Sequence, residues 1–131
     1  MKKSPVIHFE LPYIDAKRVS DFYSKVFGWD MSILGKEMGD YILAGTTETK
    51  DMMPLKPGAI NGGLFPASDK NNRYPLVTIQ VENINEAIEK VKKSGGKVLG
   101  KPQEIAGVGT YIAINDSEGN RTSMLQPKQI L

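Results

Sequence analysis

Apolar residues recur at every second position in some segments of this chain and at every third or fourth position in others. The order of these segments occurs twice along the sequence. Residues 6–13 (VIHFELPY) are rich in β-forming residues and predict a strand. Because side chains alternate across a strand, His8 and Glu10 fall on one face, and the apolar residues fall on the other. Asp15 is then placed to cap a helix that ends at Gly28. That helix carries an apolar stripe at three- and four-residue spacing, formed by Val19, Phe22, Tyr23, Val26 and Phe27.

Three more strands are predicted in the same half. They cover residues 29–34, residues 40–45, and a stretch that ends at Gly62-Gly63-Leu64-Phe65. Residues 46–61 contain two prolines and little periodicity, so most of that stretch is predicted to be loop. Four aromatic residues at helical or turn spacing are predicted to pack in the core, although Trp29 could instead face a cavity: Phe22, Tyr23, Phe27 and Trp29.

The second half repeats this order. It predicts a strand over 76–83, a helix from Ile84 to Ser94 that Gly95-Gly96 stops, and strands over 97–100, 108–116 and 121–127. A shift of 68 positions brings Phe9 onto Val77, Asp15 onto Asn83 and Gly28 onto Gly96; with two further residues, Gly39–Ile42 falls on Gly109–Ile112. Each half therefore reads strand, helix and three strands, which is an internal repeat.

The repeat predicts an α+β fold of two βαβββ modules in tandem. Module one covers about residues 5–66 and module two about residues 74–128, within a single domain of residues 1–131. A half-sheet of this size cannot bury both faces alone. The two halves are therefore expected to form one curved mixed sheet, with the helices on its outer face and a ligand cavity on the concave face.

Composition narrows the function classes. Apolar residues make up 40% of the chain and charged residues 24%, as in ordinary globular proteins. A net charge of +2 argues against a nucleic-acid partner, and the absence of cysteine excludes disulfides and thiolate chemistry. No apolar run approaches the ~18 residues of a membrane helix, and the N-terminus does not resemble a signal peptide. We therefore expect a cytoplasmic protein with no membrane partner.

Several short motifs resemble the vicinal oxygen chelate superfamily, which includes glyoxalases, bleomycin resistance proteins and extradiol dioxygenases. In the first half they are His8 with Asp15, Phe22-Tyr23 and Phe27-Gly28-Trp29; in the second half they are Val81-Glu82-Asn83-Ile84, Gly95-Gly96 and Asp116-Ser117-Glu118-Gly119-Asn120. The resemblance implies paired βαβββ modules, a small-molecule ligand in the sheet cavity and a homodimer. Apolar tail residues such as Gln129-Ile130-Leu131 could pack across the dimer interface.

The resemblance also implies where a metal would bind in metal-using members. The first ligand position falls on His8, and its repeat mate falls on Leu76. The ligand of the last strand falls on Ser123, and the remaining one lies near Gly62–Leu64. Only His8 is a good ligand, and site strength depends on ligand number and charge. We therefore expect no tightly bound divalent metal and no other cofactor.

The candidate site residues lie on the predicted strands of residues 6–13, 76–83 and 121–127. His8 and Glu10 are candidate catalytic groups for proton transfer, and His8, Glu10, Thr78, Gln80 and Ser123 are candidate ligand-binding residues. Each residue also has a purely structural interpretation. His8 could form its hydrogen bonds with backbone groups or water, and Glu10 could be a solvent-exposed residue at the edge of the cavity. Three functions stay open: a glyoxalase/bleomycin-resistance-like protein that binds a small organic molecule, a glyoxalase-like lyase or isomerase that uses His8 and Glu10, and a regulatory or partner-binding module.

Overall fold

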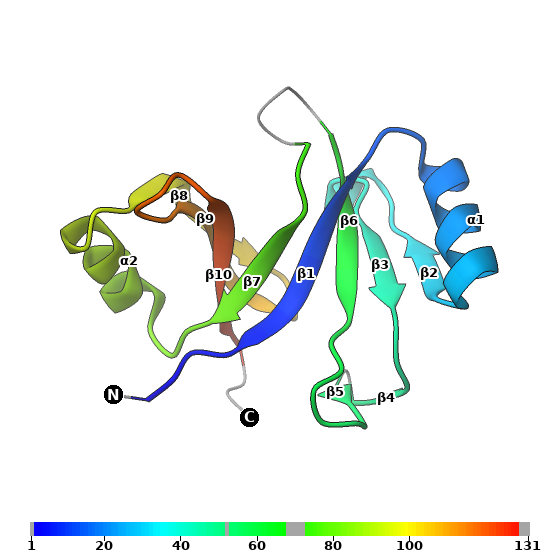
Figure 1. Ribbon diagram of the computed structural model, residues 1–131, viewed down its shortest axis with the longest axis horizontal. Coiled ribbons are helices and arrows are strands. Elements are labelled where there is room, and N and C mark those ends of the chain that lie inside the picture. Colours follow the sequence, from blue (N-terminus) through cyan, green and yellow to red (C-terminus); the bar gives the residue numbers. More distant parts are fainter. Residues whose placement is uncertain (1, 52, 68–72, 129–131) are drawn as a thin grey trace. The chain divides into compact units, whose positions relative to one another are not determined.

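The computed structural model describes residues 2–51, 53–67 and 73–128 (Figure 1). The chain divides into two compact units, one of residues 8–75 and one of residues 1–7 with 76–131. Within the described residues, each unit contains one α-helix and a mixed sheet. The chain is therefore of the α+β class, and its two modules follow one another along the sequence as the repeat predicts.

The unit of residues 8–75 has the βαβββ order. Its elements are β1 (Val6–Tyr13), α1 (Ala16–Phe27), β2 (Asp30–Ile33), the short 3-10 helix η1 (Lys36–Met38), β3 (Ile42–Gly45), the hairpin of β4 (Thr49–Lys50) and β5 (Met53–Pro54), and β6 (Gly62–Pro66). Strand β6 pairs in parallel with β1 and antiparallel with β3, which pairs in turn with β2. The first strand and the last strand of this module thus lie side by side.

The other unit repeats that connectivity. Its elements are β7 (Leu76–Gln80), α2 (Ile84–Lys93), β8 (Lys97–Ile105), β9 (Gly109–Asn115) and β10 (Arg121–Pro127). Strand β10 pairs in parallel with β7 and antiparallel with β9, which pairs with β8. Residues 6–12 and 76–81 are therefore topologically equivalent, as predicted.

The strand register confirms the 68-residue offset. Leu11 pairs with Leu64 in the first module, and Ile79, which lies 68 residues after Leu11, pairs with Met124 in the second. Leu64 in turn lies opposite Ile42, and Met124 lies opposite Ile112. The two modules therefore match residue by residue across their central strands.

Both helices begin at the predicted caps. The side chain of Asp15 accepts a hydrogen bond from the backbone N–H of Arg18, and that of Asn83 accepts one from Glu86. Helix α1 ends at Gly28, whose φ of 70° is the left-handed conformation that glycine adopts without steric cost. Helix α2 ends at Lys93, one residue earlier than predicted, so Ser94 is its C-cap.

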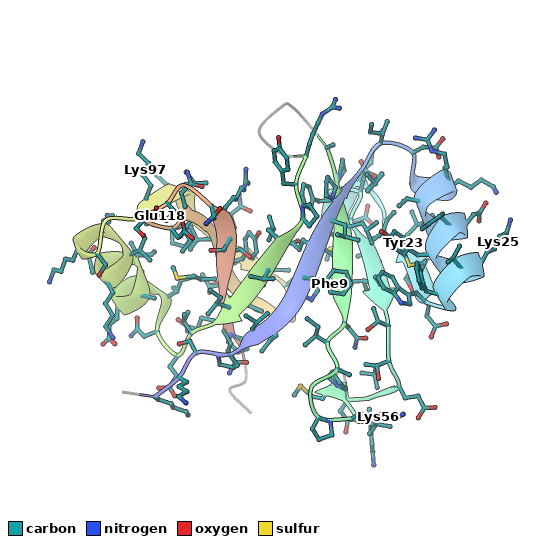
Figure 2. All side chains as sticks on the ribbon, viewed as in Figure 1. Phe9, Tyr23, Lys25, Lys56, Lys97 and Glu118 are labelled. Atoms are coloured by element: carbon teal, nitrogen blue, oxygen red, sulfur yellow. The ribbon has the colours of Figure 1, made fainter. Side chains whose placement is uncertain are left out.

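Each unit has its own apolar core. In the unit of residues 8–75 the buried centre is Ile42, Ala44 and Leu64, against which Phe9, Leu11, Val19, Tyr23 and Trp29 pack. In Figure 2, Phe9 projects from β1 and Tyr23 from α1 into this region, whereas Lys25 points away from the sheet. Tyr23 stacks on Trp29, with ring centroids 4.5 Å apart. Trp29 therefore belongs to the core on the helix side of the sheet.

Three residues of the predicted apolar stripe are not core residues. The exposed fractions of Phe22, Val26 and Phe27 are 53%, 56% and 59%. The expectation that Phe22 and Phe27 pack in the core is therefore wrong. The reason is geometric: only the edge of the stripe formed by Val19 and Tyr23 packs against the buried core of this unit, which leaves the rest of the stripe at the surface.

Some strand boundaries also differ from the prediction. Strand β6 begins at Gly62 and ends at Pro66, one residue beyond the predicted end, and the missing side chains of its first two residues make room for the rings of Phe9 and Tyr41. Strand β8 continues beyond residue 100 to Ile105, with an irregularity between Leu99 and Gln103 where Gly100 has a φ of 84°. The predicted loop of residues 46–61 contains the β4–β5 hairpin.

Residues 129–131, including the apolar tail expected at a dimer interface, lie outside the described residues. Neither helix in the described part of the chain has the length and apolar character needed to cross a membrane.

Candidate functional site

The sheet of residues 8–75 has one face covered by α1 and another that carries polar side chains. Phe9 and Leu11 point toward α1, so His8 and Glu10 point the other way. Glu10 lies beside Gly63 in β6, and Gly63 lies beside Leu43 in β3. We call this second surface the polar face, defined by His8, Glu10, Tyr41, Leu43 and Gly63.

Tyr41 joins His8 to Glu10 on the polar face. Its hydroxyl donates a hydrogen bond of 2.7 Å to Oε2 of Glu10 and lies 3.0 Å from Nε2 of His8. A phenol has a single proton, so an oxygen that donates to Glu10 must accept from the imidazole. The proton of neutral His8 therefore sits on Nε2, and the two hydrogen bonds run in one direction from His8 through Tyr41 to Glu10.

Gly63 makes the position of Tyr41 possible. A Cβ added at Gly63 would collide with the hydroxyl oxygen and ring carbons of Tyr41. The phenol thus lies directly against the backbone of β6, in the space that a side chain at residue 63 would fill. The repeat aligns Tyr41 with Tyr111 but predicts no site role for either, because nothing in the local pattern shows which way the ring of Tyr41 turns.

Burial decides the charge state of the histidine. Glu10 is only 7% exposed, and His8 is partly buried. Loss of solvent around His8 lowers its pKa from the usual 6.5, while the nearby negative charge of Glu10 acts in the opposite direction. Desolvation is the larger effect, so His8 is a neutral imidazole at pH 7 and can act as both donor and acceptor.

The candidate residues of the other unit form a different arrangement. Thr78 pairs with Ser123 across β7 and β10, and their hydroxyl oxygens are 2.8 Å apart. Both residues are buried, with exposed fractions of 2% and 0%. Gln80 is half-buried, and its backbone N–H donates to the carbonyl of Pro5. The structure thus brings together His8 with Glu10 and Thr78 with Ser123, and it leaves Gln80 outside both pairs.

The donor set at the family's ligand positions does not fit a divalent metal. The register identifies Gly63 as the repeat mate of Ser123, because they lie beside the equivalent residues Glu10 and Thr78. Of the four positions, Gly63 and Leu76 offer no ligand atom, and the Ser123 hydroxyl is neutral and bonded to Thr78. Among the residues that the structure describes, no three His, Cys, Asp or Glu side chains are grouped to hold a metal ion. The absence of a tight metal site stays a prediction.

Two surface hollows lie elsewhere in the unit of residues 8–75. One, of about 480 Å³, lies near the start of α1 and includes Tyr13, Arg18 and Phe22. The other, of about 350 Å³, lies near Asp30 and Lys56. Neither includes His8, Glu10 or Tyr41, so the candidate site is defined by its hydrogen bonds rather than by these hollows.

Comparisons with known proteins agree with the fold. Residues 6–124 match the family described as the Glyoxalase/Bleomycin resistance protein/Dioxygenase superfamily. The chain is 28% identical to a probable lactoylglutathione lyase of Vibrio cholerae, over 98% of this chain and 95% of that protein.

Solved structures give the same picture at lower identity. A methylmalonyl-CoA epimerase in complex with methylmalonyl-CoA and NH4+ has a TM-score of 0.70 and 15% identity, over 98% of both chains. A hypothetical protein from Bacillus halodurans C-125 has a TM-score of 0.68 and 18% identity, over 99% of both chains. At these identities the likeness concerns the fold alone.

The contact between Tyr41 and Gly63 can be tested by stability. We expect Gly63→Ala to lower the free energy of unfolding by about 1–3 kcal/mol, because the added methyl group overpacks against the phenol. In a Tyr41→Ala background the same change should cost clearly less. Urea unfolding of both single variants and the double variant measures this coupling. Gly45→Ala is the control, because its added Cβ would meet Asp30 at ordinary contact distance; an equal cost of Gly63→Ala in both backgrounds would contradict the contact.

The burial of His8 predicts a pH dependence of stability. Its pKa in the folded state lies below the 6.5 of the unfolded chain, so the unfolded state binds more protons between those two values. The contribution of neutral His8 is therefore complete above about pH 6.5 and is lost as the pH falls toward the folded-state pKa. Urea unfolding at pH 7.5 and pH 5.5 should show a larger loss for the native chain than for His8→Gln. An identical loss in both would contradict this prediction.

Proposed function

The chain belongs to the glyoxalase, bleomycin resistance protein and dioxygenase superfamily, and on that premise we propose that it binds a small organic molecule without a metal. The proposed binding surface is the polar face of the unit of residues 8–75. We further propose that the protein acts in the cytoplasm and as a homodimer.

One observation carries this proposal: the polar face holds a hydrogen-bonded group of His8, Tyr41 and Glu10, of which only His8 lies at a ligand position implied by the family resemblance. A neutral imidazole, a phenol and one carboxylate can orient an organic ligand by hydrogen bonds. They do not provide the ligand number and charge that hold a dication. The chemistry of the side chains therefore supports recognition of an organic molecule.

Neighbouring residues offer complementary contacts. Leu43 is exposed and lies beside Gly63, so it presents apolar surface next to the hydrogen-bonded group. Within the second module, and separately from the polar face, we retain Thr78, Gln80 and Ser123 as proposed ligand-binding residues. Thr78 and Ser123 would first have to exchange their mutual hydrogen bond for one to the ligand.

A second candidate function is a lyase or isomerase of the glyoxalase-like group. The observation that favours it is the one-directional pair of hydrogen bonds from His8 to Glu10, since connected donors and acceptors can move a proton. A relative is named a probable lactoylglutathione lyase, which is consistent with this chemical class. Turnover that is lost in His8→Ala and Glu10→Gln would support the enzyme over the binding protein.

Ligand binding without metal is the central test. We expect calorimetric titration in EDTA to show saturable binding of lactoylglutathione or methylmalonyl-CoA, the compounds in the relatives' names. His8→Gln should weaken binding by roughly 2–10-fold, which corresponds to one net hydrogen bond. Tyr74→Phe, a change at an exposed tyrosine, should bind as the native chain does.

The metal itself should be measured in the same preparation. Elemental analysis of protein purified without chelator, followed by titration with Zn²⁺, Ni²⁺ and Fe²⁺, should reveal no stoichiometric tight site. Sub-micromolar metal affinity that His8→Ala abolishes would refute the metal-independent proposal, and failure of both compounds to bind would refute the proposed ligand class.

The homodimer has its own measurement. Apolar side chains of α1 remain exposed, and exposed apolar surface is typical of protein contacts. Sedimentation equilibrium at micromolar concentration is expected to give twice the mass of the chain, and a monomer mass at that concentration would contradict the proposal.

A further inference from the structure

Asn61 is the only asparagine in the chain that is directly followed by a glycine. This dipeptide is chemically labile, because glycine has no Cβ to hinder its backbone nitrogen or to restrict its conformation. That nitrogen can attack the side-chain amide carbon of the preceding asparagine when the chain is free to bring the two atoms together. The sequence therefore makes Asn61 more reactive than the other asparagines, all of which precede residues with side chains.

The fold holds the side chain of Asn61 in an amide clamp, which we define as Asn61 with Thr46, Thr47 and Thr49. Oδ1 of Asn61 accepts hydrogen bonds from the backbone N–H groups of Thr46 at 2.9 Å and Thr47 at 3.3 Å. Its Nδ2 donates to Oγ1 of Thr49 at 3.2 Å. The clamp thus ties the residue before β6 to the residues after β3, at the base of the β4–β5 hairpin (Figure 1).

The attacking nitrogen is held by the sheet. Gly62 is buried in β6, where it pairs with Phe9 of β1 and with Ala44 of β3. The Phe9 ring occupies the space that a Cβ of Gly62 would fill. Because the clamp fixes the amide and the sheet fixes the nitrogen, the two reacting groups can rearrange only when this part of the chain opens locally.

We infer that Asn61 is a modification site, at which the chain deamidates when the amide clamp opens. The closed clamp keeps the residue as asparagine, and each opening exposes it to reaction. The chemical class of the modification is amide hydrolysis through a cyclic imide, and water is its only co-reactant. This inference is independent of the ligand and of the site on the polar face.

The reaction balances without an oxidant or a reductant. The Gly62 nitrogen forms a bond to Cγ of Asn61, while the bond from Cγ to Nδ2 breaks. Nδ2 leaves as ammonia and takes the proton that the Gly62 nitrogen loses. Water then opens the imide and returns a proton to that nitrogen. Opening at Cγ gives an aspartate, whereas opening at the backbone carbonyl carbon gives an isoaspartate.

The two products differ in what they do to β6. An aspartate keeps the normal backbone but loses the donor to Thr49. An isoaspartate inserts an additional methylene group into the backbone directly before Gly62. That insertion would displace the start of β6, where Gly62 and Gly63 make room for the rings of Phe9 and Tyr41. Deamidation at Asn61 thus connects chemical ageing of the chain to the packing of β6.

Incubation in H₂¹⁸O at pH 7.5 tests the site, because the water oxygen enters the product. Peptide mapping by mass spectrometry locates the label. In urea-unfolded chain we expect ¹⁸O at residue 61 ahead of every other asparagine. In the folded chain the label should appear there more slowly by roughly tenfold or more, because three hydrogen bonds must open first. Asn61→Gln should remove this label, because the longer side chain does not form the same ring.

A pair of matched variants tests the clamp. Thr49→Val keeps the shape of an exposed residue but removes the acceptor of the Asn61 amide, so folded Thr49→Val should deamidate roughly 2–10-fold faster than the native chain. Thr110→Val is the control, because its hydroxyl bonds Glu104 in the other unit. Thr110→Val should react at the native rate, and all three chains should react equally when unfolded.

Each result decides part of the inference. Unfolded chain without ¹⁸O at residue 61 would overturn the site itself. A folded chain that reacts as fast as the unfolded chain, or faster, would overturn the protection by the clamp. Folded Thr49→Val that reacts at the native rate would show that its hydrogen bond does not control opening. If Thr49→Val does not fold, the comparison of folded with unfolded native chain still decides the protection.

Discussion

The contact between the Tyr41 phenol and the backbone of Gly63 is the constraint on which the candidate site depends. Without a side chain at residue 63, the ring lies against β6 and its oxygen reaches both His8 and Glu10. The preceding residue plays the same part on the other face, because a Cβ at Gly62 would collide with the ring of Phe9. The two glycines therefore place one aromatic ring on each side of the strand, one in the core and one in the candidate site.

The two modules share their topology but carry different side chains at equivalent positions of their central strands. Glu10 beside Gly63 in the first module is equivalent to Thr78 beside Ser123 in the second. In the first pair, Glu10 is a carboxylate and Gly63 has no side chain, so the Tyr41 ring occupies that space and its hydroxyl donates to Glu10. In the second pair, the two small hydroxyl groups are hydrogen-bonded to each other. The first pair thus includes an acidic group, whereas the second is a closed contact between two neutral groups.

The fold does not depend on which residues occupy the family's ligand positions, for a physical reason. Strand pairing in each module comes from backbone hydrogen bonds, and its core comes from apolar side chains on the helix side of the sheet. Neither depends on a metal. Solved structures with 13–18% identity to this chain accordingly share its fold, while the fold by itself fixes no chemistry. The function must be argued from the side chains on the polar face.

The sequence by itself determined the modules, their offset, the helix caps and the division of β1 into an apolar and a polar face. These features depend on periods and caps that act over a few residues, as Asp15 and Asn83 show. Only the tertiary structure decided that Tyr41 joins two residues 33 and 31 positions away, and that Phe22 and Phe27 remain exposed. Contacts between strands depend on the register of the strands and on which ring occupies the space over a glycine. Neither can be predicted from the local sequence pattern.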